Sequence, residues 1–166
     1  MDRLELDHLL EDLELIEKRL SELQEVIVDR CDAREDAKLL RSMPGVGHFT
    51  ATALACRIAD VSRFPRASSL ANYWGLTLGC RNSGEKTQRL GSITKAGSVM
   101  ARWLLAQVTY KALREDARLR EWYKQIKRRR GSCIARVAVM RKLATVIWQM
   151  LSRGQTYAEC RQLSTS

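Results

Sequence analysis

The sequence predicts a mainly α-helical protein, with a long coiled-coil-like helix at the N-terminus followed by a compact helical domain. Three observations lead to this fold class. Apolar residues recur every three or four positions over several segments, no segment is rich in strand-forming residues, and the chain combines 45% hydrophobic residues with only two prolines. Its 166 residues are therefore enough to bury one core.

Residues 1–37 predict an acidic coiled-coil arm, because apolar side chains follow alternating steps of three and four, as at the a and d positions of a heptad. Further apolar residues widen this stripe, which leaves open a single amphipathic helix folded onto its own domain. A helix of this length is marginal without a partner, so we favour pairing, in a helical hairpin or between subunits, and expect a homo-oligomer formed through residues 6–27. The a and d residues are Leu6, Leu9, Leu13, Ile16, Leu20, Leu23 and Ile27.

A basic helical domain is expected over residues 38–157, and it begins with three short helices. The first, over residues 37–42, should end before Pro44, because the residue preceding a proline avoids the helical region. A helix of small residues follows over residues 49–58, and a third over residues 68–74 should end at the glycine after it.

Longer helices follow a glycine-rich stretch. Residues 76–93 lack helical periodicity, which predicts a loop or an irregular hairpin. Helices should then run from Thr94, as an N-cap, to residue 113, over residues 116–127, and over residues 134–154. Residues 158–166 predict a loose polar tail. The expected buried residues of the first long helix are Val99, Trp103, Leu104, Val108 and Leu113.

Charge is divided unevenly, with a net charge of −8 over residues 1–37 and +18 over residues 38–166. The overall charge of +10 favours a polyanionic partner such as nucleic acid. No apolar run approaches the roughly 18 residues of a bilayer span, and the N-terminus lacks the order of a secretion signal, so we expect a cytoplasmic protein with no membrane partner. The five widely spaced cysteines predict reduced, mostly buried thiols, and with two histidines they predict no metal site.

The turn Met43-Pro44-Gly45-Val46-Gly47-His48 lies between two expected helices. Successive glycines let backbone N–H groups face an anion at the start of the next helix, which is the helix-hairpin-helix pattern of phosphate binding. Gly45 and Gly47 are therefore candidate nucleic-acid contacts. The alternative is a structural turn in which Val46 fills the core.

A dense basic surface is expected in the C-terminal half. Its densest run, Arg128, Arg129 and Arg130, predicts a surface that follows phosphates, or else a solvated helix end. Trp122 and Tyr123 fit either stacking on bases or packing in the core. The other cations are Arg114, Arg118, Arg120, Lys124, Lys127, Arg136, Arg141 and Lys142.

Ser83 stands beside Gly84 in a basic loop. A free hydroxyl, a flexible backbone and nearby cations are what phosphoryl transfer to an alcohol requires. No histidine is near in the sequence to act as a base, and the spacing favours neither Glu85 nor Asp60 for that role. The residues alone thus leave open a catalytic Ser83 and an ordinary basic loop. The cations of the loop are Arg81, Lys86, Arg89 and Lys95.

Several motifs stand in a fixed order over residues 38–157. They are Leu40-x-x-Met43-Pro44-Gly45-Val46-Gly47, Arg63-Phe64, Leu70-Ala71-x-Tyr73-x-Gly75-Leu76-Thr77, Ser83-Gly84, Ile93-Thr94-Lys95-Ala96-Gly97, Arg102 and Arg141-Lys142-Leu143. This order resembles the C-terminal domain of the transposases of insertion-sequence family 110, which are DEDD-type recombinases related to the pilin-gene invertases, and some of which use a bridge RNA. The arm resembles the family's coiled-coil connector. The chain departs from the pattern at Leu78, where the family often has proline, and in the residues before Ser83.

The resemblance implies that Ser83 is a nucleophile that attacks a scissile DNA phosphate and becomes linked to it. It also implies DNA, and in some members a guide (bridge) RNA, as partners, with Arg81, Lys86, Arg89, Lys95 and Arg102 as nucleic-acid contacts. Family members need Mg²⁺ held by four carboxylates of an N-terminal RuvC-like domain, which residues 1–37 do not supply. We therefore expect a fragment or a lone C-terminal part that binds nucleic acid without cutting it. Two other functions stay open: a non-catalytic helix-hairpin-helix-type module and a coiled-coil interaction protein.

Overall fold

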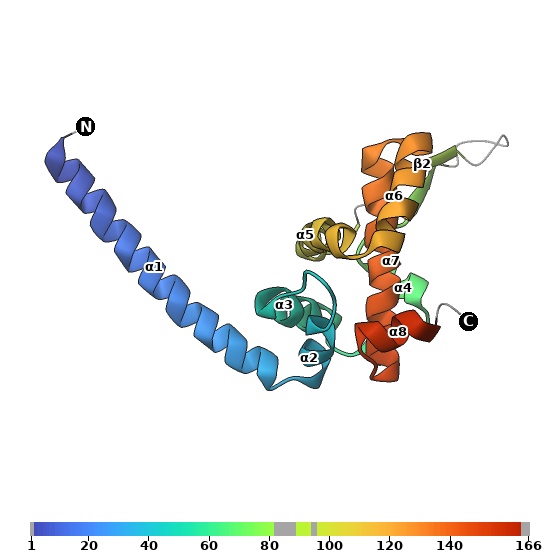
Figure 1. The fold of residues 1–166 in the computed structure, drawn as a ribbon, viewed down its shortest axis with the longest axis horizontal. Helices are drawn as coiled ribbons and strands as arrows, with labels where there is room; N and C mark the ends of the chain where they lie inside the picture. Colours follow the sequence, from blue (N-terminus) through green and yellow to red (C-terminus); the bar gives the residue numbers. More distant parts are fainter. Residues whose placement is uncertain (1, 82–88, 94–95, 164–166) are drawn as a thin grey trace.

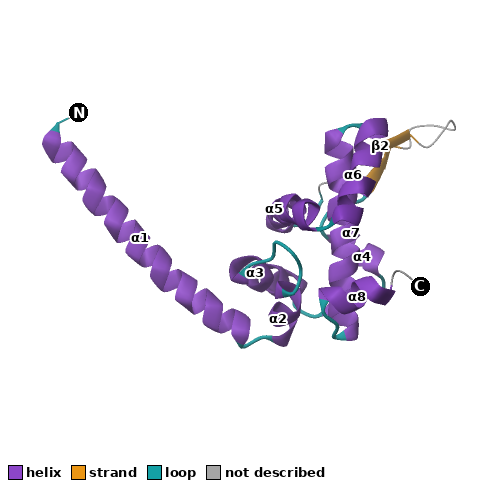
Figure 2. Cartoon of the chain, viewed as in Figure 1, coloured by secondary structure: helices purple, strands orange, loops and turns teal. Residues whose placement is uncertain are grey.

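The computed structural model describes residues 2–81, 89–93 and 96–163, and it confirms a mainly α-helical fold (Figures 1 and 2). The described part contains eight α-helices, one 3₁₀ helix and one two-stranded antiparallel sheet. None of its helices combines the length and the apolar character that a bilayer span requires. The elements are α1 (Arg3–Asp32), α2 (Glu35–Arg41), α3 (His48–Ile58), η1 (Val61–Arg63), α4 (Ala67–Tyr73), β1 (Leu78–Arg81), β2 (Arg89–Ile93), α5 (Val99–Glu115), α6 (Ala117–Arg130), α7 (Ser132–Arg153) and α8 (Tyr157–Leu163).

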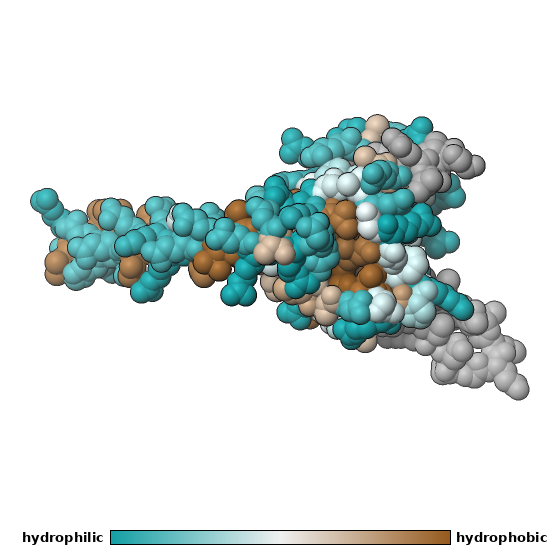
Figure 3. All heavy atoms as spheres, turned by 90° about the horizontal axis from the view of Figure 1, so that it is seen from below, coloured by the Kyte–Doolittle hydropathy of each residue, from teal (hydrophilic) through white to brown (hydrophobic). Residues whose placement is uncertain are grey.

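Helix α1 projects from the rest of the molecule and does not fold back onto it (Figure 1). Its apolar stripe lies in solvent: Leu6 is 43% exposed and Leu23 is 58% exposed. Only Cys31, in the last turn, is buried, where the end of α1 meets α2 and α3. Figure 3 shows the apolar side chains of the arm as separate brown patches among polar residues. The interpretation of residues 6–27 as a helix packed onto its own domain is therefore wrong for this chain.

The core lies around α7, which packs against α4, α5 and α6 and, at its C-terminal end, against α8. Leu143, Ile147 and Met150 of α7 are fully or almost fully buried. Two of the small residues of α3, Ala51 and Ala55, have no exposed surface, which allows this helix to pack closely.

The expected irregular hairpin is present as β1 and β2, whose register pairs Leu78 with Ile93 and Arg81 with Arg89 and shifts between Leu78 and Cys80. It projects on the side of the helical domain away from α1 (Figure 1). Gly75, with a φ of 69°, ends α4 as predicted.

Helix α5 begins later than predicted. Its N-cap is Ser98, whose Oγ accepts a hydrogen bond from the Ala101 N–H at 3.2 Å, and Thr94 lies outside the described residues. Of the residues expected to be buried on this helix, Leu104 and Val108 are buried and Leu113 is partly buried. Val99 and Trp103 are 71% and 53% exposed, so their assignment to the core was wrong.

The tail expected over residues 158–166 contains the helix α8, so it is not loose throughout. Thr156 and Glu159 form the start of this helix: the Thr156 N–H donates to Glu159 Oε2 at 2.7 Å, as in a capping box. The Tyr157 N–H donates to Ser42 Oγ at 2.9 Å, and Cys160 is buried. Cys31 and Cys160 are buried as expected, but Cys56 and Cys133 are exposed.

Candidate nucleic-acid interface

The glycine turn between α2 and α3 has both a buried and an exposed side. Met43 and Val46 are buried, so the turn does fill the core as the structural alternative required. Gly45 has a φ of 84°, and a Cβ there would lie 2.5 Å from Lys111 Cβ of α5, which restricts this position to glycine. Gly47 is exposed and has no heavy atom within 4 Å of a Cβ built on it.

Gly47 is also the N-cap of α3, and no side chain caps this helix end. The first N–H groups of an α-helix have no partner within the helix, and the helix dipole makes this end attractive to an anion. An exposed, side-chain-free N-cap lets a phosphate approach these groups closely. The geometry at Gly47 is therefore compatible with the expected phosphate contact, whereas Gly45 has a packing role.

The cations of α6 and α7 lie mostly in solvent. Arg128, Arg129 and Arg130 are exposed in the last turn of α6, where positive charge also stabilises the C-terminal end of the helix dipole. Of the eleven cations expected on this surface, only Lys124 forms an ion pair within the described part of the chain, with Glu121 at 2.8 Å. A cluster of exposed cations without carboxylate partners is what a phosphate-binding surface requires.

The aromatic residues of α6 pack against the core, which is one of the two alternatives that the sequence left open, whereas those of α5 are exposed. Trp122 and Tyr123 are partly buried against the core, and the Lys142 Nζ lies 5.0 Å from the centroid of the Trp122 ring. The exposed aromatic residues of α5 are Trp103 and Tyr110, at 53% and 54%. They lie seven residues apart, on the face opposite the buried positions of α5, and this spacing is the signal that could have identified them.

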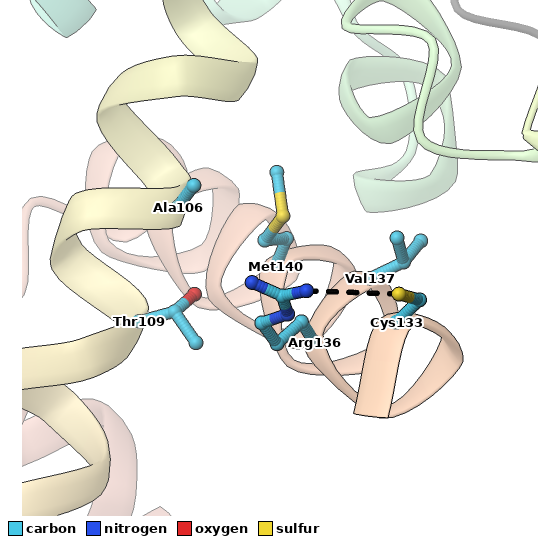
Figure 4. Close-up of a pocket in the computed structure, with 6 residues that line it drawn as sticks. All are labelled: Ala106, Thr109, Cys133, Arg136, Val137 and Met140. Carbon is cyan, nitrogen blue, oxygen red and sulfur yellow. Dashed lines mark hydrogen bonds between the residues drawn. The ribbon is translucent and has the colours of Figure 1, made fainter. Parts of the chain in front are cut away.

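Arg136 connects α5 and α7 at the edge of a small apolar pocket (Figure 4). Its Nη1 donates to the Tyr110 hydroxyl at 2.9 Å, and its Nη2 is 3.6 Å from Cys133 Sγ, the hydrogen bond drawn in Figure 4. The contact with Cys133, and then that with Tyr110, raises the pKa of Arg136 above its ordinary value. The pocket has a volume of about 220 Å³ and is lined by Ala106, Thr109, Cys133, Arg136, Val137 and Met140.

Arg102 of α5 joins the segment before the hairpin to the segment after it, at the base of the hairpin. Its Nη1 donates to the carbonyl oxygens of Trp74, at 3.1 Å, and of Gly97, at 3.2 Å. A Cβ at Gly75 would lie 2.5 Å from the carbonyl oxygen of Ala96. A Cβ at Gly97 would overlap the carbonyl oxygen of Tyr73. Residues 73–75 and 96–97 thus meet backbone to backbone, and we call this contact the neck.

The candidate nucleophile Ser83 lies outside the described residues, as do Lys86 and Lys95. Arg81 and Arg89 are described as paired backbone positions of the hairpin. Asp60, one of the acidic residues considered as a base, instead caps η1: its two carboxylate oxygens accept hydrogen bonds from the Ser62 N–H at 2.8 Å and the Ser62 hydroxyl at 2.6 Å. These bonds lower the pKa of Asp60, which makes it a weaker base.

Comparison with known proteins identifies the family. Residues 37–124, more than half of the chain, match the family model described as "Transposase IS116/IS110/IS902 family". The chain belongs to this transposase family.

Relatives from several bacteria resemble the chain over most of its length. The transposase for insertion sequence element IS1111A of Coxiella burnetii is 33% identical over 145 residues, which cover 85% of this chain and 40% of that protein. A probable family 20 transposase of Pseudomonas aeruginosa is 32% identical over 159 residues, covering 92% and 46%. The transposase for IS1328 of Yersinia enterocolitica is 28% identical over 146 residues, covering 86% and 43%. This transposase-family chain therefore spans less than half the length of each of these three relatives.

The described part of this transposase-family chain does not fit a Mg²⁺ ion. Within it, no group of three or more His, Cys, Asp or Glu side chains is placed to hold a metal. The acidic residues of α1 lie along one extended, exposed helix, where carboxylates cannot converge on one cation.

Proposed function

We propose that this chain is the DNA-binding and strand-transfer part of a transposase, with Ser83 as the nucleophile. The membership of residues 37–124 in a transposase family is the observation that carries the proposal. The exposed cations of α6 and α7 and the open N-terminus of α3 support it, because both favour a phosphate backbone over an uncharged partner.

In the proposed step the Ser83 oxygen forms a bond to the phosphorus of one DNA phosphodiester. The bond from that phosphorus to one deoxyribose oxygen breaks, the released hydroxyl takes up a proton, and the hydroxyl proton of Ser83 is lost to solvent or a base. The loop cations Arg81, Lys86 and Arg89 would stabilise the charge that develops on the phosphoryl oxygens. Mg²⁺ and its carboxylates would come from a RuvC-like domain outside this sequence, so the isolated chain should bind DNA without cutting it.

We further propose that copies of the chain associate through residues 6–27, because the apolar stripe of α1 is exposed along its length.

A guide RNA is a second polyanion that the exposed cations of α6 and α7 could bind. DNA and RNA both present phosphates, so competition between a duplex and a structured RNA for the chain would distinguish them.

The position of Ser83 relative to bound DNA can be tested without catalysis. Cys56, Cys80 and Cys133 are first replaced by serine, and Ser83→Cys then introduces one new thiol at position 83, while the two remaining native cysteines, Cys31 and Cys160, are buried. This variant is incubated with duplex DNA that carries bromoacetyl groups on backbone phosphorothioates, where a thiolate displaces bromide to form a stable thioether. We expect it to form the DNA adduct about ten times faster than a matched variant that has Ser83 and, of the three replaced cysteines, retains only Cys133, since proximity raises the effective concentration of the reacting groups.

An equal or slower reaction at position 83, with DNA binding intact, would overturn the role of Ser83 and favour the second candidate function. That candidate is a non-catalytic nucleic-acid-binding module, which the exposed turn at Gly47 supports independently. Absence of any salt-sensitive DNA binding would overturn both and leave a coiled-coil interaction protein.

A further inference from the structure

The neck brings together two parts of the chain that are more than 20 residues apart. The carbonyl of Trp74 comes just before the hairpin and that of Gly97 just after it, and the backbones around them touch because Gly75 and Gly97 have no side chains. Both glycines also have positive φ angles, of 69° and 136°. A residue with a side chain would be strained at either position and would separate the two backbones.

Arg102 supplies the polar connection across this contact. One guanidinium nitrogen donates to a carbonyl on each side, so the two backbones are linked through a single group. Hydrogen bonds from a charged donor are stronger than neutral ones, and the bond to Trp74 is partly buried. The Ala101 N–H in the first turn of α5, which carries Arg102, donates to the N-cap oxygen Ser98 Oγ and fixes the same end.

These contacts give Arg102 a role in the backbone contact at the neck. Its Nη1 is directed at two backbone carbonyls, whereas the exposed arginines 128–130 have no such partners in the described part of the chain. Closing both ends of a segment reduces the number of conformations available to everything between them. The segment closed by the neck, residues 76–95, includes position 83.

We propose that Arg102 is a positioning residue for Ser83, which acts by closing the neck and contacts neither the scissile phosphate nor another part of the nucleic acid. The inference rests on the proposed function of Ser83, but the state of the neck is measurable without it. Arg102 thus determines how often Ser83 meets a bound phosphate, while the exposed cations determine how tightly DNA binds.

The first experiment measures amide hydrogen exchange in the intact chain. The peptides of interest cover residues 75–81 and 89–101, which include the Leu76 N–H that donates to the Ala71 carbonyl at 2.9 Å. We expect exchange there to be about ten times faster in both Arg102→Gln and Arg102→Lys, because an ammonium group lacks the planar donor arrangement of the guanidinium. Arg114→Gln, which removes an exposed cation from the same helix, is the matched control and should leave these peptides unchanged.

The second experiment combines Arg102→Gln with the Ser83→Cys variant in which Cys56, Cys80 and Cys133 are replaced by serine. We expect the rate of adduct formation with reactive DNA to fall about tenfold, while the affinity for DNA and its salt dependence change less than twofold. Arg102→Lys should lower the adduct rate as well, although it retains the charge.

Four results would overturn the proposal. Unchanged exchange in both Arg102 variants would show that the bonds to Trp74 and Gly97 do not hold the neck. Accelerated exchange with an unchanged adduct rate would show that the neck does not position residue 83. A weaker affinity with a smaller salt dependence, restored by Arg102→Lys, would make Arg102 a phosphate contact. If Ser83→Cys gives no adduct even with Arg102 present, the proposed role of Ser83 fails and the positioning role fails with it, while the exchange data alone still report whether Arg102 holds the neck.

Discussion

The indole N–H of Trp148 donates a hydrogen bond to the carbonyl oxygen of Phe64 at 2.8 Å, and this bond joins residues 84 positions apart in the sequence. It ties α7 to the segment between η1 and α4. The ring of Phe64 in turn lies 5.2 Å from that of Tyr73, the residue at which the neck begins. The central helix and the base of the hairpin are therefore connected through three residues.

Trp148→Phe should lower the free energy of unfolding by about 1–2 kcal/mol, because it removes this bond and leaves a partly buried carbonyl without its donor. Urea unfolding followed by circular dichroism measures the change. Trp103→Phe is the matched control, since the same substitution at a 53% exposed site should cost less than about 0.5 kcal/mol. Equal effects of the two substitutions would mean that the Trp148 bond contributes nothing.

Much of the fold could be predicted from the sequence because its signals are local. Apolar periodicity identified the long helices, and Gly75 and Gly154 mark the ends of α4 and α7 as expected. The start of α5 could not be predicted, since Thr94 and Ser98 are both favourable N-caps and the local sequence does not distinguish them.

The candidate site could be predicted only in part, for the same reason. The backbone bonds of Arg102 could not be predicted, because one of its carbonyl partners lies 28 residues away and leaves no local trace in the sequence. The exposed position of Trp103 was missed because a large apolar residue was assigned to the core, although Leu104, Leu105 and Val108 already define the opposite face of α5. The cluster of cations could be predicted without knowledge of the tertiary contacts, because a run of three arginines at a helix end is exposed whatever it binds.

The two glycines of the turn before α3 should tolerate substitution by alanine to different degrees. Gly45→Ala should lower the free energy of unfolding by about 2 kcal/mol or more, because it places a side chain at a φ of 84° and only 2.5 Å from Lys111 Cβ. Gly47→Ala meets no neighbour and should cost only about 0.5–1 kcal/mol, because alanine is a poorer N-cap than glycine. Thermal unfolding of the two variants distinguishes them, and a stable Gly45→Ala protein would contradict the packing described here.

Gly47→Asp should separate stability from binding. Aspartate is a favourable N-cap and its charge suits the helix dipole, so the free energy of unfolding should rise by about 0.5 kcal/mol. The same carboxylate would occupy and repel the phosphate position at the start of α3, so affinity for duplex DNA should fall about tenfold while Gly47→Ala retains it. Fluorescence anisotropy with a labelled duplex measures the DNA affinity of both variants. If Gly47→Asp binds DNA as well as the unaltered chain does, the turn is structural only.

Replacement of Arg128, Arg129 and Arg130 by glutamine should weaken DNA binding and flatten its salt dependence. Each phosphate contact that is lost should reduce the slope of log K against log salt by about 0.9. The matched control replaces three cations of the acidic arm, Lys18, Arg19 and Arg30, by glutamine and removes the same charge at a distance from the proposed surface. An equal effect of the two triple variants would show that net charge, rather than this surface, determines binding.

The exposed stripe of α1 predicts self-association that depends on position within the heptad. Leu13 and Leu20 occupy a positions and are each 52% exposed, so Leu13→Lys with Leu20→Lys should convert an oligomer into a monomer in sedimentation velocity at micromolar concentration. Glu14→Lys with Glu22→Lys adds the same lysines off the stripe and should leave the oligomer intact. A chain that is monomeric before any substitution would contradict the proposed pairing.

The junction between α1 and α2 should weaken in acid because of Asp36. The Arg34 guanidinium donates to both carboxylate oxygens, at 3.0 Å and 2.6 Å, and the Ala37 N–H donates at 2.8 Å, so the pKa of Asp36 lies below its ordinary value. A carboxyl whose pKa is lowered by folding stabilises the protein above its unfolded pKa of about 3.9, and that stabilisation is lost as the pH falls through the folded pKa. The pair is partly exposed, so its contribution at neutral pH should not exceed about 1 kcal/mol.

Comparison of the chain with Asp36→Asn should therefore show a constant difference in the free energy of unfolding from about pH 7 to about pH 5, and a difference that shrinks below about pH 4. The amide retains an acceptor for the Ala37 N–H, so the substitution isolates the charge. Arg34→Gln should remove most of the pH dependence by itself, because its hydrogen bond is the largest cause of the lowered pKa. A difference between the chain and Asp36→Asn that does not change with pH down to about pH 3 would mean that the carboxylate of Asp36 gains nothing from Arg34 on folding.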